Sequence, residues 1–202
     1  GGMSASGDLD RVWTVPNVLS AARLVIAIGC FVAIERAAWA GALGLFLVAA
    51  STDWVDGWWA RRFGQISRLG RIFDPLVDKV LVCGAFVLLA ARGDASAIAP
   101  WMAVVVVVRE LVVTAVRAEM ERMGHDFSAG LSGKLKMVLQ CAAVALDLAA
   151  RTWPEAAIAG VELRVAATGA AWAAVITTAW SGVEYLAKAG WLMAGKLSLI
   201  HI

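Results

Sequence analysis

The chain has 202 residues, of which 61% are apolar and 17% charged. Water-soluble domains carry about 45–50% apolar and about 25% charged residues, so this composition argues against an ordinary soluble globular protein. The formal net charge of +2 is uninformative as a total, and we expect no nucleic-acid partner. The three cysteines lie inside apolar stretches and are odd in number, which predicts buried free thiols and no disulfide framework.

Long apolar stretches alternate with short charged clusters, which is typical of several membrane-spanning helices. Inside a bilayer only helices and closed barrels satisfy the backbone, and these stretches are too long for barrel strands. We therefore predict an all-α integral membrane protein with six transmembrane helices. In chain order, these are expected at residues 18–34, 39–60, 72–91, 100–120, 134–150 and 164–187.

Three regions are expected along the chain. Residues 1–15 combine a tag remnant, Gly1-Gly2, with an N-terminal cytoplasmic segment. Residues 16–190 form the six-helix membrane domain, and residues 191–202 form a C-terminal tail. Basic residues gather on the side of the predicted bundle that carries both termini, so the positive-inside rule places that side in the cytoplasm. The expected location is a bacterial-type inner membrane.

The most informative stretch holds four aspartates, with small and basic residues beside them. Asp53 and Asp56 are spaced i,i+3, and Asp74 and Asp78 are spaced i,i+4, so each pair lies on one face of its predicted helix. The connection between these helices is short, which predicts antiparallel neighbours whose acidic faces converge. Oxygen-only ligands favour Mg²⁺ or Mn²⁺, and four carboxylates are enough for two ions. Two such ions suit phosphoryl chemistry.

These residues allow other interpretations. An Asp–Arg pair at a span end is often an interfacial ion pair, and Gly57 and Ala60 alone would more often serve helix packing. An ion or metal transporter also places carboxylates in spans, but usually near mid-membrane and within internal repeats, which this sequence lacks. A structural membrane scaffold leaves the four aspartates unexplained.

The pattern Asp-x2-Asp-Gly-x2-Ala-Arg-x8-Gly-x3-Asp-x3-Asp, complete at residues 53–78, resembles the signature of the CDP-alcohol phosphotransferases. The resemblance implies a fold of six transmembrane helices, usually a homodimer, with a polar active-site cavity open to the cytoplasm. It also implies transfer of a phosphatidyl group from a CDP-activated lipid to a small alcohol, with release of CMP.

The resemblance further implies a role for each matching residue. Asp53, Asp56 and Asp74 would bind two Mg²⁺ or Mn²⁺ ions, and Asp78 would complete that site and take the proton from the acceptor hydroxyl. The CDP-lipid would be bound by Asn17, Ser20, Asp53, Asp56, Gly57, Ala60, Arg61, Ser67, Gly70 and Asp74.

Sequence patterns that are less specific than the one at residues 53–78 concern the acceptor alcohol. The patterns Pro16-Asn17-x-Leu19-Ser20-x2-Arg23, Asp74-Pro75-Leu76-x-Asp78-Lys79 and Gly133-Lys134-x-Lys136-x3-Gln140 resemble the bacterial phosphatidylglycerophosphate synthases of this family. The donor would then be CDP-diacylglycerol, and the acceptor sn-glycerol 3-phosphate. The acceptor phosphate would meet Arg109, Arg117, Lys134 and Lys136, although each alone could equally be a surface residue attracted to anionic membrane lipids.

Other acceptors remain as alternatives, and two departures from that pattern leave room for phosphatidylglycerol. Phe73 replaces a leucine that is common before Asp-Pro, and Met137 replaces a threonine that is common after Lys-x-Lys. The alternatives are a cardiolipin synthase of the CDP-alcohol type, whose acceptor is phosphatidylglycerol and would need a lipid-accessible groove, or an enzyme that uses inositol phosphate. Asp147 is a further carboxylate within a predicted span, and it has no counterpart in the family pattern.

Overall fold

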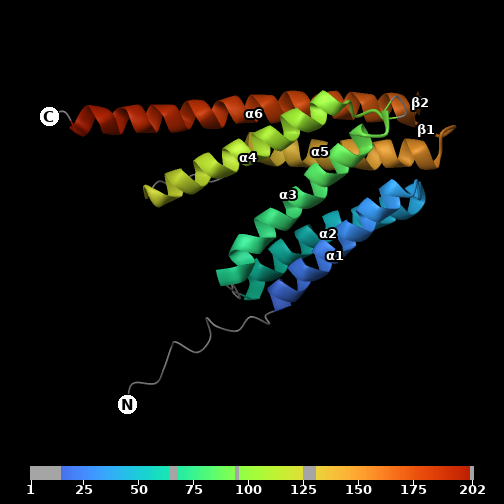
Figure 1. Cartoon of the computed structure of the whole chain (residues 1–202), viewed down its shortest axis with the longest axis horizontal. Coiled ribbons are helices and arrows are strands. Elements are labelled where there is room, and N and C mark those ends of the chain that lie inside the picture. The colour runs from blue at the N-terminus through green and yellow to red at the C-terminus, as the bar shows by residue number, and fades with distance from the viewer. Residues whose placement is uncertain (1–14, 64–67, 94–95, 125–130, 201–202) are drawn as a thin grey trace, which may run out of the picture. The chain divides into compact units, whose positions relative to one another are not determined.

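The structure is a computed structural model that describes residues 15–63, 68–93, 96–124 and 131–200. These ranges are mostly helical, as predicted, with one short hairpin (Figure 1). The elements in chain order are α1 (Val15–Glu35), α2 (Trp39–Phe63), α3 (Arg68–Ala90), α4 (Pro100–Arg122), α5 (Leu131–Thr152), β1 (Ala157–Ile158), β2 (Val161–Glu162) and α6 (Leu163–Ile200). In the described ranges, no helix is long and apolar enough to count as a candidate membrane span.

The chain divides into two compact units, residues 1–88 and residues 89–202. In the first unit, α1 packs on α2. Fully buried small residues line both helices, including Ala27 and Cys30 of α1 and Ala42 of α2. The Cys30 thiol donates a hydrogen bond to the carbonyl oxygen of Ala42 at 3.5 Å. Small side chains at this contact let the two helix backbones approach closely.

Helix α3 is positioned against α1 in the same unit by one close approach. A Cβ atom at Gly84 of α3 would overlap the ring of Phe31 on α1. Residues Val77, Leu81 and Ala85, which are spaced by one helical turn, are buried on α3. Glycine is therefore the residue that lets Phe31 lie directly on the backbone of α3.

In the second unit, α6 packs against both α4 and α5. The face of α6 that is fully buried carries alanines at helical spacing, Ala167, Ala171 and Ala174. Buried Val144 and Leu148 lie on α5. A row of alanines leaves a shallow surface on α6, and this allows the longer side chains of a neighbouring helix to pack closely against it.

A two-stranded hairpin precedes α6 and was not predicted. Strands β1 and β2 pair antiparallel, with Ala157 opposite Glu162 and Ile158 opposite Val161. The two residues between the strands, Ala159 and Gly160, have φ of 51° and 81°. Positive φ at both central positions is what a type I′ turn requires. Strands of two residues are too short for hydrophobic periodicity to reveal.

Helix α6 is longer than the sequence analysis predicts. The expected end near Ala187 is wrong, because α6 continues to Ile200 and includes residues 191–200 of the segment expected to be a tail. No proline lies in residues 188–200, and the Ala, Leu, Met and Lys residues there are good helix formers. Nothing in this segment therefore stops the helix. The start of α4 at Pro100 was predicted, because proline is favoured in the first turn of a helix.

Candidate active site

The four aspartates lie on the two helices that the sequence assigns to them. Asp53 and Asp56 belong to α2, and Asp74 and Asp78 belong to α3. Because both segments are helical, each pair occupies one face of its helix. The side chains themselves lie outside the described residues, so the convergence of the four carboxylates stays a prediction. The same holds for the side chains of the other predicted donor residues, Asn17, Ser20, Gly57, Ala60, Arg61, Ser67 and Gly70.

The donor atoms in this set fit a hard divalent cation. Four carboxylates offer only oxygen ligands, which Mg²⁺ and Mn²⁺ prefer. Among the side chains that the structure describes, no three His, Cys, Asp or Glu residues gather into a metal site, and the four aspartates are not among those side chains. The helical spacing and the donor chemistry are therefore what support a metal site here.

A buried charged cluster joins α4, α5 and α6. We define the Arg109 cluster as Arg109, Glu110, Lys136 and Ser181. The Arg109 Nη1–H donates to Glu110 Oε1 at 3.1 Å, and its Nη2–H donates to Ser181 Oγ at 2.9 Å. Lys136 Nζ donates to the same Glu110 oxygen. The three charged side chains are only 8–9% exposed.

Two further contacts extend the Arg109 cluster along α5 and α6. The Gln140 Nε2–H donates to Thr178 Oγ1 at 2.8 Å, one turn along each helix from the cluster, and both side chains are buried. The Arg109 guanidinium also lies over the ring of Tyr185, 5.6 Å from its centroid. Buried charges are costly unless they are paired and hydrogen-bonded. This concentration of polar groups therefore indicates a specific role.

The electrostatics of the Arg109 cluster favour an anion. Two cations, Arg109 and Lys136, both pair with the carboxylate of Glu110. The buried Arg109 Nε–H has no acceptor in the part of the chain that the structure describes. A phosphate oxygen is the kind of acceptor that an arginine N–H binds best.

The structure brings together two of the four predicted acceptor residues. Arg109 and Lys136 meet at Glu110, whereas Arg117 lies two turns further along α4 and pairs with Glu121 at 3.1 Å. The side chains of that second pair are 42% and 57% exposed. Lys134 is exposed as well.

Several members of this network were not predicted as site residues. They are Glu110, Thr178, Ser181 and Tyr185. Hydroxyl residues one turn apart inside an otherwise apolar helix were the available signal on α6, but a serine or threonine can also bond its own helix backbone. The sequence alone therefore does not distinguish a hydroxyl that contacts a neighbouring helix from one that bonds its own backbone.

Asp147 has a structural role that the sequence did not reveal. It is 2% exposed, and its Oδ1 accepts the backbone N–H of Ala97 at 2.6 Å. Its Oδ2 accepts the Nε–H of Arg151 at 3.0 Å, and Ser96 Oγ lies 3.4 Å away from the same oxygen. Asp147 therefore fastens the segment that leads into α4 onto α5.

Two aspartate pairs at helical spacing and a buried cationic cluster are features expected of an enzyme that acts on phosphate groups. The family model of the CDP-alcohol phosphatidyltransferases matches residues 13–180. The chain belongs to this family, and it is therefore a transferase. The resemblance stated from residues 53–78 is confirmed.

Curated relatives agree with this assignment. The chain is 37% identical over 150 residues to the CDP-diacylglycerol–glycerol-3-phosphate 3-phosphatidyltransferase of Bacillus subtilis, covering 74% of this chain and 72% of that protein. It is 32% identical over 185 residues to a probable phosphatidylglycerophosphate synthase of Mycobacterium tuberculosis, covering 89% and 83%. It is also 32% identical over 187 residues to the CDP-diacylglycerol–glycerol-3-phosphate 3-phosphatidyltransferase of Escherichia coli, covering 88% and 95%.

Proposed function

We propose that this chain transfers the phosphatidyl group of CDP-diacylglycerol to sn-glycerol 3-phosphate, giving phosphatidylglycerophosphate and CMP. The observation that carries the proposal is the similarity to relatives named for this reaction over most of their length and of this chain. The alternative acceptors, phosphatidylglycerol and inositol phosphate, have no comparable support.

The donor site lies on α2, α3 and the start of α1. Gly57 and Ala60 carry little or no side chain, which leaves room for a nucleotide diphosphate beside the backbone of α2. Arg61 offers a planar guanidinium to phosphate oxygens. The remaining donor contacts are assigned to Asn17, Ser20, Ser67 and Gly70.

Asp53, Asp56, Asp74 and Asp78 would hold two Mg²⁺ or Mn²⁺ ions. When bound, such ions supply charge neutralisation for the diphosphate and for the leaving CMP oxygen. Asp78 acts as the general base and takes the proton of the acceptor hydroxyl. The hydroxyl oxygen forms a bond to the β-phosphorus, and the bond from that phosphorus to the CMP oxygen breaks. Positioning by the surrounding side chains supplies much of the rate.

The acceptor phosphate is assigned to the basic residues of α4 and α5. Arg109 contributes its unsatisfied Nε–H, and Lys136 adds a second buried cation. Arg117 and Lys134 are exposed, and they would draw the phosphate from solvent before it reaches the Arg109 cluster.

A membrane location is supported by the outward-facing side chains. Large apolar residues recur at helical spacing on the exposed faces of three helices, where a soluble monomer rarely carries such patches. They include Val25, Ile28 and Val32 of α1, Val104, Val108 and Leu111 of α4, and Trp172, Ile176 and Trp180 of α6. We propose an inner-membrane homodimer whose termini and active site face the cytoplasm.

The test is CMP release by the detergent-purified chain with CDP-diacylglycerol and Mg²⁺ or Mn²⁺. Glycerol 3-phosphate, phosphatidylglycerol, inositol phosphate and serine are supplied separately. Release with glycerol 3-phosphate alone, abolished by EDTA, is expected. Release with another acceptor only would replace the substrate, and no release with any acceptor would contradict the proposed activity.

Asp78→Asn tests the proposed base. The amide keeps the shape of the side chain but cannot accept the hydroxyl proton, so turnover is expected to fall by about 10²–10⁴-fold. The KM for CDP-diacylglycerol is expected to change much less. Turnover close to that of the unaltered enzyme would remove Asp78 from this role.

A further inference from the structure

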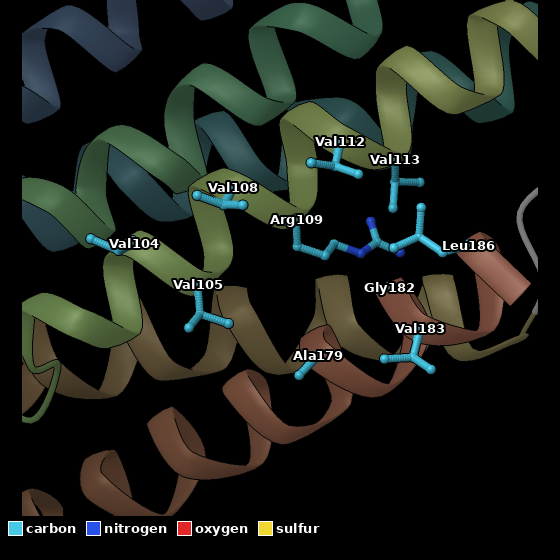
Figure 2. A pocket seen from close by; sticks show the side chains of 10 residues that line it. All are labelled: Val104, Val105, Val108, Arg109, Val112, Val113, Ala179, Gly182, Val183 and Leu186. Atoms are coloured by element: carbon cyan, nitrogen blue, oxygen red, sulfur yellow. The ribbon is translucent and has the colours of Figure 1, made fainter.

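One face of α6 receives the Arg109 side chain. Thr178, Ser181, Gly182 and Tyr185 stand at positions i, i+3, i+4 and i+7, so they share this face, and all four are buried. Figure 2 shows Arg109 reaching from α4 toward Gly182. We call Ser181, Gly182 and Tyr185 the Arg109 seat, because each of them contacts a different part of Arg109.

The Ser181 hydroxyl is oriented toward Arg109 by its own helix. Its O–H donates to the carbonyl oxygen of Thr178 at 3.1 Å. A serine hydroxyl has one proton and two lone pairs, so this bond leaves a lone pair for the Nη2–H of Arg109, 2.9 Å away. Glu110 accepts from Nη1. Both ends of the guanidinium are therefore fixed, one from α4 itself and the other from α6.

Gly182 and Tyr185 hold the rest of the Arg109 side chain. A Cβ atom at Gly182 would lie 3.1 Å from Arg109 Cγ, which is closer than ordinary van der Waals contact. The missing side chain therefore lets the stem of Arg109 rest on the backbone of α6. The Arg109 Cζ atom lies over the Tyr185 ring, 5.6 Å from its centroid, as in a cation–π contact. The seat thus restrains the stem, one end and one face of Arg109.

We propose that Ser181, Gly182 and Tyr185 are positioning residues, which hold Arg109 ready for the phosphate of the acceptor alcohol. The inference rests on the proposed function, which assigns that phosphate to Arg109 and Lys136. A side chain that is already held in place loses less freedom when a ligand binds. The seat acts through Arg109, so its loss weakens binding of the acceptor. Binding of the CDP-lipid is spared, because the residues assigned to it belong to the first unit.

Two hydroxyl deletions on α6 test the hydrogen bond. Ser181→Ala removes the acceptor of the Arg109 Nη2–H, and it is expected to raise the KM for glycerol 3-phosphate about five- to tenfold. The KM for CDP-diacylglycerol should stay the same. Thr177→Ala is the control, because the Thr177 hydroxyl donates to the backbone of its own helix, at Ala173 and Ala174. It should change neither KM. A serine with only a structural role would lower the melting temperature and leave the ratio of the two KM values unaltered.

Two glycine substitutions on α6 test the close approach. Gly182→Ala places a methyl group against the stem of Arg109, so the KM for glycerol 3-phosphate is expected to rise by a similar factor. At Gly190, a Cβ atom would meet no neighbouring element within 4 Å in the part of the chain that the structure describes, so Gly190→Ala should change neither KM. Alanine favours a helix more than glycine does, so neither substitution should weaken α6. Gly182→Ala therefore tests positioning even where Ser181→Ala fails to fold.

Binding is measured apart from the reaction by thermal unfolding of the full-length chain in detergent with Mg²⁺. Glycerol 3-phosphate, inorganic phosphate and glycerol are titrated separately at equal concentrations. The two phosphate compounds are expected to raise the melting temperature of the unaltered chain, whereas glycerol is not. The Kd values obtained from these shifts should rise about five- to tenfold in Ser181→Ala and Gly182→Ala. They should stay unchanged in Thr177→Ala and Gly190→Ala.

Three outcomes would overturn the proposal. They are equal Kd values in the seat variants and their controls, equal rises of the two KM values, and no stabilisation of the unaltered chain by either phosphate compound. CMP release is scored separately. Weaker phosphate binding in the seat variants, with no CMP release by the unaltered chain, counts against the proposed reaction alone. CMP release with glycerol 3-phosphate, together with unchanged binding in the seat variants, counts against the seat alone.

Discussion

Glu110 is the side chain that holds the two buried cations of the Arg109 cluster together. Its Oε1 accepts from both Arg109 and Lys136, so the substitution Glu110→Gln removes the negative charge that stabilises them. Breaking a buried ion pair from one side typically costs about 3–5 kcal/mol. We expect a loss of that size in the free energy of unfolding, measured in detergent. Relative to the unaltered enzyme, the KM for glycerol 3-phosphate should rise more than the KM for CDP-diacylglycerol.

The matched control lies on the same helix. Glu121 pairs with Arg117 in an exposed position, where such pairs contribute less than about 1 kcal/mol. Glu121→Gln is therefore expected to leave the unfolding free energy nearly unchanged. Equal losses for the two variants would show that burial of Glu110 does not matter.

Sequence patterns identified some residues of this cluster and missed others for a physical reason. Arg109 and Lys136 stand out because charged residues inside apolar helices are rare. Ser181 is 72 positions from Arg109 along the chain, and its contact depends on how α4 packs on α6. Such a contact is set by tertiary packing, which periodicity within one helix does not contain.

At the scale of elements, a side chain of α5 holds the segment that leads into α4. Asp147 accepts hydrogen bonds from the segment just before α4 and pairs with Arg151 on its own helix. Asp147→Asn weakens these charge-assisted contacts in a buried place, so we expect a loss of about 3 kcal/mol in unfolding free energy. Turnover per folded molecule should stay within about twofold, because Asp147 has no part in the proposed chemistry; that limit corresponds to about 0.4 kcal/mol in the barrier.

Glu155→Gln provides the comparison for that variant, since it removes a carboxylate at an exposed position close in sequence. It is expected to change neither quantity. A variant Asp147→Asn that unfolds normally but loses its turnover would assign Asp147 to the reaction, and the structural role would then be wrong.

The helices were predictable because each apolar stretch has clear limits in the sequence. Pro100 marks the start of α4, and the charged residues after Ala60 and Met120 mark the ends of two predicted helices within three residues. The end of α6 was missed, because amphipathic and polar helix formers continue past the apolar stretch. The hairpin at residues 157–162 was missed because its strands have two residues each.

For the whole molecule, the family could be predicted from eight positions within residues 53–78, and the match over residues 13–180 confirms it. The meeting of the four aspartates is a different kind of statement. It depends on how the faces of α2 and α3 turn toward each other, and the spacing of residues fixes only which aspartates share a face. The arrangement of the complete active site therefore stays a prediction.

The proposed membrane topology makes opposite ends of α5 accessible from opposite sides. This helix has 22 residues and is about 33 Å long, close to the thickness of a bilayer core of about 30 Å. Glu121 precedes it and Glu155 follows it, and both are exposed. We expect Glu155→Cys to react with a membrane-impermeant maleimide in intact bacterial cells, and Glu121→Cys to react only after lysis.

Two controls make that topology experiment decisive. The unaltered chain reports any labelling of Cys30, Cys83 and Cys141, which lie within helices.

Alkaline carbonate should leave the protein in the membrane pellet, because apolar side chains face outward on α1, α4 and α6. Labelling of Glu121→Cys in intact cells would reverse the orientation. Release of the protein by carbonate without detergent would contradict its integration into the membrane, because an integral protein keeps its apolar faces in contact with lipid under these conditions.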